Sequence, residues 1–384
     1  MRCPGNQTNN MKYYLIAGEA SGDLHGSNLI KGLKSEDPQA DIRFWGGGMM
    51  EAAGGTKVHD YKETAVMGLT DVLLNLGRIG RNLRECKADI IAWHPDVVIL
   101  IDYPGFNMKI ARFCHENSIR VFYYIAPKTW ASRENRNRKL KAWIDKLFII
   151  FPFEIPYFES RHIPFIYKGN PLIDAVDNHQ YTRPAEGRYI AILAGSRKGE
   201  IARTMPKAMQ MADILHSLPE YADYRFIVAG APARSIEDYN SHIAGRNYVE
   251  VTFGRTYDIL KFADAALINS GTASLEAALI GTPQVVCWST SFITAVLAKY
   301  LLRVMDHVKY ISLGNLILDK LAFRELIQYD FTSGEAAAEI RRLIEDLPYR
   351  ERMLNDYREI RQHLGGTGAS RSVAKAMIQC LEEA

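Results

Sequence analysis

The chain has few cysteines and no long apolar run. Its five cysteines are odd in number and scattered without metal-ligand spacing, which indicates free thiols in a reducing compartment and not a disulfide framework. No stretch approaches the roughly 20 apolar residues that a membrane-spanning helix needs. Residues 1–10 are polar and lack the apolar core of a signal peptide. We therefore expect a cytoplasmic protein whose residues 1–10 form a disordered leader.

Several chemical motifs are also absent. No two aspartates lie two residues apart, which removes the DxD clamp for a metal-bound diphosphate, and no HExxH, CxxC or Walker A pattern occurs. A formal net charge of +3 over 384 residues does not favour nucleic-acid binding, but it suits contact with anionic lipid or phosphorylated substrates. We expect no metal, no other cofactor and no nucleic-acid partner.

Apolar runs and helix-like segments alternate twice along the chain, and a chain of this length favours two domains. The predicted strands span residues 12–17, 42–45, 97–101, 120–125 and 146–151, and then 189–193, 224–229, 248–251, 265–269 and 284–287. The main helices are predicted at residues 25–34, 106–117, 133–144, 200–216, 274–280 and 370–381. This pattern predicts the α/β class, with two Rossmann-like, doubly wound parallel-sheet domains facing a cleft.

The domain limits follow from a polar stretch at residues 177–187, after which the strand–helix pattern restarts. We expect a first domain over 11–178 and a second over 187–364. The remaining segment, 365–384, holds the last helix, and the sequence leaves open whether it packs on the first domain or on a partner protomer.

The most informative segment is a strand, a small-residue turn and a helix. The strand 265–269 is followed by Ser270, Gly271 and Thr272, and Glu276 lies in the first turns of the helix. Such a turn brings backbone N–H groups and the positive end of the helix dipole to the sheet edge, where a phosphate can bind. Glu276 can accept hydrogen bonds from ribose hydroxyls. The turn predicts a nucleotide diphosphate site, although an ordinary βαβ turn has the same short pattern.

The first turn of the second half, Gly195-Ser196-Arg197, has similar chemistry. Glycine, hydroxyl and arginine at a strand-to-helix turn can hold phosphate oxygens, and Arg197 can neutralise a leaving diphosphate. The alternative is that Arg197 and Lys198 are solvated surface charges.

Two acidic segments follow strands of the first half. GEASGD, with Glu19, Ser21 and Asp23, lacks the G-x-G-x-x-G spacing and puts a carboxylate where a pyrophosphate would approach, so it favours a hydroxyl-rich ligand such as a sugar. Asp102 comes directly after the strand 97–101, where a partly desolvated carboxylate can take a proton from an attacking hydroxyl. Helix capping by Ser21 and Asp23, and a turn role for Asp102 before Pro104, are the structural alternatives.

Two segments suggest a membrane surface. Residues 66–76 are apolar and are followed by Arg78, Arg81, Arg84 and Lys87, and residues 292–303 combine an apolar face with flanking cations. These patterns suit helices lying on anionic lipid. Helices that pack on the core with a charged outer side would have the same pattern.

In this order and spacing, the motifs resemble the lipid-A-disaccharide synthase family of inverting, two-domain GT-B glycosyltransferases. The resemblance extends over nearly the whole chain from Met11. It is carried by Gly18–Asp23, Ala65–Leu69, the Asp102 segment, Ala126–Ala131, Gly195–Arg197, Ser270–Glu276 and Tyr310–Asn315. The chain departs from the family at Gly105, Ala194, Gly314 and Ser132, where aspartate, proline, proline and tryptophan are usual.

The resemblance implies transfer of 2,3-diacylglucosamine from UDP-2,3-diacylglucosamine to 2,3-diacylglucosamine 1-phosphate, which gives a β-1,6 disaccharide phosphate and UDP. It implies that Asp102 deprotonates the acceptor 6-hydroxyl at the cytoplasmic leaflet of the inner membrane, and it leaves a homodimer open. The implied acceptor-site residues are Glu19, Ser21 and Gly22. The implied donor-site residues are Ser196, Arg197, Ser270, Gly271, Thr272, Glu276 and Asn315.

Other functions remain open from the residues alone. A UDP-sugar 2-epimerase or hydrolase has the same architecture, and a transferase for undecaprenyl-linked acceptors also needs UDP and a membrane face, although it usually has a glycine-rich first turn. A non-catalytic sugar-nucleotide-binding protein is a third alternative. An NAD oxidoreductase fits least, because both halves lack the glycine fingerprint.

Overall fold

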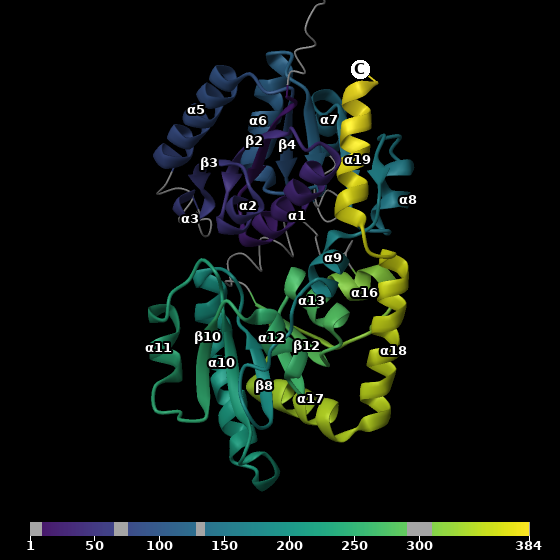
Figure 1. Ribbon diagram of the computed structural model, residues 1–384. Helices are drawn as coiled ribbons and strands as arrows, with labels where there is room; N and C mark the ends of the chain where they lie inside the picture. The colour runs from purple at the N-terminus through teal and green to yellow at the C-terminus, as the bar shows by residue number, and fades with distance from the viewer. Residues whose placement is uncertain (1–9, 65–75, 128–134, 290–308, 384) are drawn as a thin grey trace, which may run out of the picture. The chain divides into compact units, whose positions relative to one another are not determined.

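The computed structural model describes residues 10–64, 76–127, 135–289 and 309–383, which form two compact units. The first unit contains the described residues up to Asp174 and those from Gly368 onward, and the second unit contains those from Ala175 to Thr367. Each unit is a parallel sheet covered by helices, coloured from purple to teal in the first, apart from its yellow C-terminal helix, and from teal to yellow-green in the second (Figure 1). The predicted fold class is therefore confirmed.

The first sheet has the strand order β3-β2-β1-β4-β5-β6-β7. Its strands are β1 (Lys12–Ala17), β2 (Asp41–Gly46), β3 (Thr56–Asp60), β4 (Val97–Ile101), β5 (Val121–Tyr124), β6 (Lys146–Ile149) and β7 (Ile166–Tyr167). The central strand β4 is fully buried, as expected for a parallel strand covered by helices on both faces. The order reverses between β1 and β4, which makes that edge the topological switch point, where doubly wound folds bind ligands.

The second sheet repeats this plan with the order β10-β9-β8-β11-β12-β13. Its strands are β8 (Tyr189–Leu193), β9 (Arg225–Gly230), β10 (Val249–Phe253), β11 (Ala265–Asn269), β12 (Gln284–Trp288) and β13 (Glu325–Ile327). The switch point lies between β8 and β11, the strands that precede the two predicted phosphate-binding turns.

Helices connect the strands in both units. In the first unit they are α1 (Ala20–Glu36), α2 (Gly48–Ala53), α3 (Tyr61–Thr64), α5 (Leu76–Trp93), α6 (Pro104–Glu116), α7 (Asn135–Trp143) and α8 (Glu154–Glu159). In the second they are α10 (Lys198–His216), α11 (Glu237–Ile243), α12 (Thr256–Phe262), α13 (Thr272–Ile280), α16 (Leu313–Leu318), α17 (Ser333–Glu345) and α18 (Leu347–Leu364). Helix α9 (Pro171–Asp177) begins in the first unit and ends in the second.

The start of α1 differs from the prediction. The helix begins at Ala20 and not at residue 25, so most of the GEASGD segment forms its first turn and not an open loop. Glu19 is the N-cap residue in an extended conformation. Because this segment is helical, its side chains are spread around a helix instead of lining one loop.

The last helix, α19 (Ala369–Glu382), packs against α1 in the first unit (Figure 1). A Cβ added at Gly32 of α1 would lie 2.8 Å from the Ser370 carbonyl oxygen, so glycine permits this close contact. Asp174 accepts hydrogen bonds from the backbone N–H groups of Gly368 (2.6 Å) and Ser370 (2.9 Å) and so caps the start of α19. The chain thus returns from the second unit to complete the first.

Candidate active site

In the first unit, two predicted segments meet at the switch point. Strands β1 and β4 are neighbours, with Ala17 paired to Ile101, so GEASGD and Asp102 leave adjacent strands at the same sheet edge. Glu19 is exposed and Asp102 is half-buried. The fold therefore brings together two carboxylate segments that lie far apart in the sequence.

The turn after β4 has a strained backbone. Asp102 and Tyr103 both have left-handed conformations, with φ angles of 46° and 47°, each costing about 1–3 kcal/mol in a non-glycine residue. The turn is held by the Asp102 N–H bonded to the Tyr124 carbonyl (3.1 Å), and by the Tyr123 hydroxyl donating to the Asp102 carbonyl (2.6 Å). Burial, and then the Asp102 carboxylate, raise the pKa of Tyr123 well above its usual range, so this phenol stays a donor.

Asn107, for which no sequence motif indicated a role, fixes the same turn. Its fully buried amide donates from Nδ2 to the carbonyl of Asp102 (2.8 Å) and, at longer range, to those of Ile101 (3.2 Å) and Ile16 (3.4 Å). One side chain thus joins the ends of β1 and β4 across the switch point. Its spacing of five residues from Asp102 was visible in the sequence, but nothing there showed that it faces inward.

Gly18 is required by Tyr103. A Cβ at Gly18 would lie 2.2 Å from Cδ1 of the Tyr103 ring, which stacks on Phe106 with centroids 5.6 Å apart. Burial and the Glu19 carboxylate raise the pKa of Tyr103, whereas Arg78 at the start of α5 opposes this shift. Gly18 therefore lets the ring beside Asp102 lie directly against the end of β1, near charges of both signs.

The other predicted acceptor-site residues differ in accessibility. Ser21 is half-buried in the first turn of α1, but Gly22 is buried, and its added Cβ would lie 3.2 Å from the Cβ of Ala17. Gly22 therefore allows close packing of the helix on the strand, and the expectation that it contacts a sugar has no exposed surface to support it. Asp23 is buried and accepts hydrogen bonds from the N–H groups of Gly47 (2.9 Å), Met49 (3.2 Å) and Met50 (3.1 Å) at the start of α2. The capping role considered for Asp23 is confirmed, but on another helix.

In the second unit, the two phosphate-type turns also meet. Leu193 of β8 pairs with Ile268 of β11, so the turns after both strands share one sheet edge. Asn269 joins them, because its buried Nδ2 donates to the Ala194 carbonyl (3.1 Å) and to the Thr204 hydroxyl (3.0 Å). It corresponds to Asn107 of the first unit: a side-chain amide ties the strand ends at each switch point.

The Gly195-Ser196-Arg197 turn is stabilised by Glu200. The Glu200 carboxylate accepts hydrogen bonds from the N–H groups of Ser196 (3.0 Å) and Arg197 (3.2 Å), and Gly195 has a φ of 112° that favours glycine. The Arg197 guanidinium lies 3.5 Å from Glu200, and its side chain is 50% exposed. Because Glu200 accepts hydrogen bonds from these two N–H groups, they are less available to phosphate oxygens.

The turn after β11 has a different arrangement. Gly271 is the N-cap residue of α13, which has no side-chain cap, and Gly271 and Thr272 are partly exposed. Ser270 is tied on both sides, with its N–H bonded to the Cys287 carbonyl (2.8 Å) and its hydroxyl donating to the Ile311 carbonyl (3.3 Å). The start of α13 is therefore the better-formed anion site of the two turns.

Glu276 lies one turn into α13 and is partly exposed. Burial raises the pKa of its carboxyl, and a hydrogen bond from the Tyr257 hydroxyl to Oε1 (2.8 Å) acts in the opposite direction. Tyr257 was not identified from the sequence. It lies before the predicted strand 265–269, in a segment with no recognisable motif.

Asn315 is fully engaged within the protein. It is completely buried, donates to the Phe323 carbonyl (3.0 Å) and to Glu325 (2.9 Å), and accepts from the N–H groups of Ala322 (2.9 Å) and Phe323 (3.2 Å). Direct contact between the Asn315 side chain and a donor substrate would require these hydrogen bonds to break. Glu325 also accepts from the N–H groups of Ile311 (3.0 Å) and Ser312 (2.9 Å), and Ile311 receives the Ser270 hydrogen bond. We therefore expect Asn315 to act on the donor turn indirectly, through the fold of this segment.

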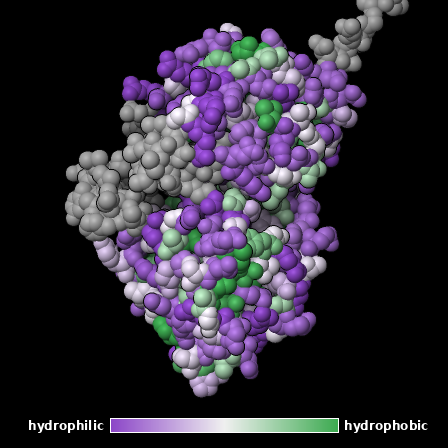
Figure 2. Space-filling model, turned by 90° about the vertical axis from the view of Figure 1, so that its left-hand side faces the viewer, coloured by the Kyte–Doolittle hydropathy of each residue, from purple (hydrophilic) through white to green (hydrophobic). Residues whose placement is uncertain are grey.

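Several predictions fall outside the described residues: the motif Ala65–Leu69, the residues Lys128–Ala131, the proposed membrane segment at 66–76 except for its last residue, and the segment at 292–303. Of the basic residues on α5, Arg81 and Arg84 are exposed, and the Lys87 ammonium lies 4.9 Å from the centroid of the Phe113 ring. The described surface in Figure 2 is mostly hydrophilic, with apolar areas bounded by hydrophilic residues. None of the described helices has the length and apolar character to span a membrane. The described residues also contain no group of three or more His, Cys, Asp or Glu side chains arranged to hold a metal ion.

Known proteins resemble the chain in sequence and in fold. The family model described as lipid-A-disaccharide synthetase matches residues 13–378. The lipid-A-disaccharide synthase of Geobacter metallireducens is 36% identical over 381 residues, covering 97% of this chain and 98% of the relative.

Among solved structures, a UDP-GlcNAc 2-epimerase from Neisseria meningitidis bound to UDP-GlcNAc has a TM-score of 0.67 at 15% identity, covering 96% of this chain and all of that one. The glycosyltransferase of kitacinnamycin has a TM-score of 0.62 at 16% identity, covering 97% and 99%. These structures support the GT-B fold. With the family match over nearly its whole length, the chain belongs to the lipid-A-disaccharide synthase family and is a glycosyltransferase of lipid A disaccharide synthesis.

Proposed function

We propose that the chain transfers 2,3-diacylglucosamine from UDP-2,3-diacylglucosamine to the 6-hydroxyl of 2,3-diacylglucosamine 1-phosphate, with inversion and without a metal ion. The observation that carries this proposal is the different chemistry of the two switch points. The first has carboxylates, Glu19 and Asp102, and the second has an uncapped helix N-terminus beside an arginine. Because both proposed substrates carry acyl chains, the proposal includes a reaction at the cytoplasmic surface of the inner membrane.

The second unit binds the donor in this proposal. The backbone N–H groups at the start of α13 and the helix dipole bind the diphosphate, and the half-exposed Arg197 adds a positive charge. Glu276 accepts hydrogen bonds from the ribose hydroxyls. The fold relative from Neisseria meningitidis, whose structure contains UDP-GlcNAc, supports a UDP-sugar as the ligand of such a fold.

The first unit supplies the acceptor and the base. Asp102 removes the proton of the acceptor 6-hydroxyl, the oxygen forms a bond to the anomeric carbon, and the bond from that carbon to the diphosphate oxygen breaks. UDP leaves with the bonding electrons, and attack from the opposite face inverts the anomeric centre. The strained turn, held by Asn107 and Tyr123, fixes the backbone that carries this carboxylate.

A UDP-sugar 2-epimerase or hydrolase is the second candidate, because a 2-epimerase is among the proteins of similar fold. Such an enzyme would act on the UDP-sugar without an acceptor lipid. The need for acceptor therefore separates the two candidates.

The test is UDP release from UDP-2,3-diacylglucosamine in detergent with a chelator, with and without the acceptor. The variant is Asp102→Asn, and the matched control is Asp96→Asn. Asp96 lies just before the opposite end of β4, and its carboxylate accepts a hydrogen bond from the Lys12 N–H (2.7 Å). Loss of a general base lowers the rate by roughly 10²–10⁴-fold. We expect this loss for Asp102→Asn and not for Asp96→Asn. In the unmodified protein, UDP release should require the acceptor and should survive chelation. Release without acceptor, or an active Asp102→Asn, would contradict the proposal.

A further inference from the structure

We propose that Tyr257 is a positioning residue for the donor, whose hydroxyl orients the Glu276 carboxylate toward the ribose hydroxyls of UDP. This inference rests on the proposed donor-binding role of Glu276. It adds a residue from a neighbouring helix that never touches the substrate but sets the direction of the group that does.

The hydrogen bond between the two side chains joins helices α12 and α13. Tyr257 Oη donates to Glu276 Oε1 at 2.8 Å, and it is the one protein donor to this carboxylate within the described ranges. Burial, followed by the Glu276 charge, raises the pKa of Tyr257 well above its usual range, so the phenol remains a donor at working pH. A carboxylate with one oxygen fixed in this way keeps its second oxygen for an incoming diol.

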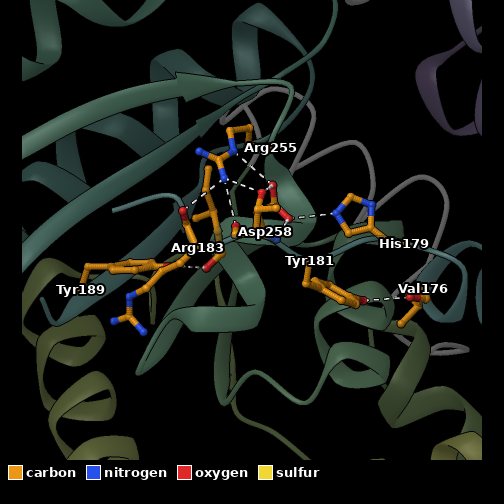
Figure 3. Close-up of polar contacts among 9 residues, drawn as sticks. Val176, His179, Tyr181, Arg183, Tyr189, Arg255 and Asp258 are labelled. Carbon is orange, nitrogen blue, oxygen red and sulfur yellow. Dashed lines mark hydrogen bonds and ion pairs between the residues drawn. The ribbon is translucent and has the colours of Figure 1, made fainter. Parts of the chain in front are cut away.

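The Tyr257 ring also packs against a second side chain. His179 meets the Tyr257 ring edge to face, with centroids 5.3 Å apart and an interplanar angle of 68°. His179 is held by Asp258, the residue after Tyr257, through a contact of 3.0 Å between Nε2 and Oδ1 (Figure 3). The phenol therefore has little freedom to leave Glu276, because its ring lies against a clamped neighbour.

Asp258 strengthens this clamp by holding the segment before β8. It accepts hydrogen bonds from the Thr182 N–H (3.0 Å), the Thr182 hydroxyl (3.1 Å) and Arg255 Nε (3.1 Å), as Figure 3 shows around the labelled Asp258 and Arg255. Helix α12 thus carries two adjacent functions: Asp258 anchors the segment around residues 179–182, and Tyr257 orients Glu276. A ligand-binding carboxylate supported in this manner is preorganised and loses less entropy on binding.

The experiment compares binding of UDP with binding of 2′,3′-dideoxy-UDP, measured by calorimetry. The difference reports the hydrogen bonds to the ribose hydroxyls. The variants are Tyr257→Phe, which keeps the ring and removes the hydroxyl, and Glu276→Ala. The matched control is Tyr181→Phe, a tyrosine of the same aromatic group whose hydroxyl instead donates to the Val176 carbonyl (2.9 Å).

We expect the unmodified protein to prefer UDP over the dideoxy analogue by about ten-fold or more, the usual contribution of hydrogen bonds to a charged group. Glu276→Ala should abolish this preference, and Tyr257→Phe should remove most of it while leaving affinity for the dideoxy analogue unchanged. Tyr181→Phe should keep it.

The inference is overturned if Tyr257→Phe keeps the full preference, or if it weakens both ligands equally, as a purely structural role would. If the unmodified protein binds UDP but Glu276→Ala retains the preference, the ribose role of Glu276 fails and the inference fails with it. If the unmodified protein binds neither ligand, the proposed donor site itself is wrong.

Discussion

Replacing Asp258 with asparagine should loosen the attachment of the segment before β8 to helix α12. The side chain is only 8% exposed and accepts hydrogen bonds from His179, Thr182 and Arg255. An asparagine has nearly the same shape, but its amide has one acceptor oxygen in place of two, and its NH₂ group would face donors. The change therefore removes the charge and most of the acceptor capacity without leaving a cavity.

The magnitude follows from the pKa of this carboxyl. Burial raises it, but the hydrogen bonds from the Thr182 N–H, His179 and Arg255 outweigh burial and lower the pKa from an ordinary 3.8 to about 2. The difference, 3.8 − 2 = 1.8, corresponds to about 2.5 kcal/mol at about 1.36 kcal/mol for each pH unit. Because the folded-state pKa is the lower one, this stabilisation is complete only well above the ordinary pKa of 3.8 and is lost as the pH falls through about 2. It is therefore fully present at pH 8.

The assay is amide hydrogen exchange at pH 8 on a peptide that contains Thr182, whose N–H donates to Asp258. A loss of about 2.5 kcal/mol corresponds to roughly 70-fold faster exchange, if opening of this segment is local. The matched control is Asp264→Asn, which breaks an exposed ion pair with Arg188 whose side chains are 62% and 32% exposed. Such a surface pair contributes about 0–1 kcal/mol, so exchange should change little.

Two results would refute this reasoning. Exchange at Thr182 in Asp258→Asn could match that of the unmodified protein, which would mean that the hydrogen bonds do not hold the segment. Alternatively, Asp258→Asn and Asp264→Asn could accelerate exchange equally, which would mean that burial of the Asp258 carboxylate adds nothing over an exposed pair.

Two further substitutions test the first unit. Gly18→Ala places a Cβ 2.2 Å from the Tyr103 ring, so we expect UDP release to fall even at temperatures where the variant remains folded in a thermal melt. Unchanged release would show that the ring does not position the Asp102 turn. Asp23→Ala removes the acceptor for three N–H groups at the start of α2, and we expect a loss of about 2 kcal/mol, or about 4–8 °C in a thermal melt. A melting temperature equal to that of the unmodified protein would contradict the capping role.

Strands that are buried on both faces could be predicted closely from the sequence. The strands Lys12–Ala17, Val97–Ile101, Tyr189–Leu193 and Ala265–Asn269 begin and end at the predicted residues. A parallel strand covered on both faces needs a continuous apolar run, which is a local signal. The edge strand β3 was missed because its sequence, TKVHD, is half-exposed and has no such run.

The site was predicted in part, and the omissions share one cause. The turns with Glu19, Asp102, Arg197 and Ser270 were located because each follows a recognisable strand. The amides of Asn107 and Asn269, by contrast, act across two strands, and a sequence does not show which way a side chain faces. Such contacts depend on tertiary packing.

The sequence by itself determined the succession of strands and helices along the chain, the division into two similar halves and the family. These depend on local apolar patterns and on short motifs. The tertiary structure alone decided that the paired turns meet at the switch points, that Asp23 caps α2, that Asn315 is internally bonded and that Tyr257 holds Glu276. Each of these is a contact between distant residues. Hydrogen bonds and close packing of that kind arise only when the sheet order brings the strand ends together.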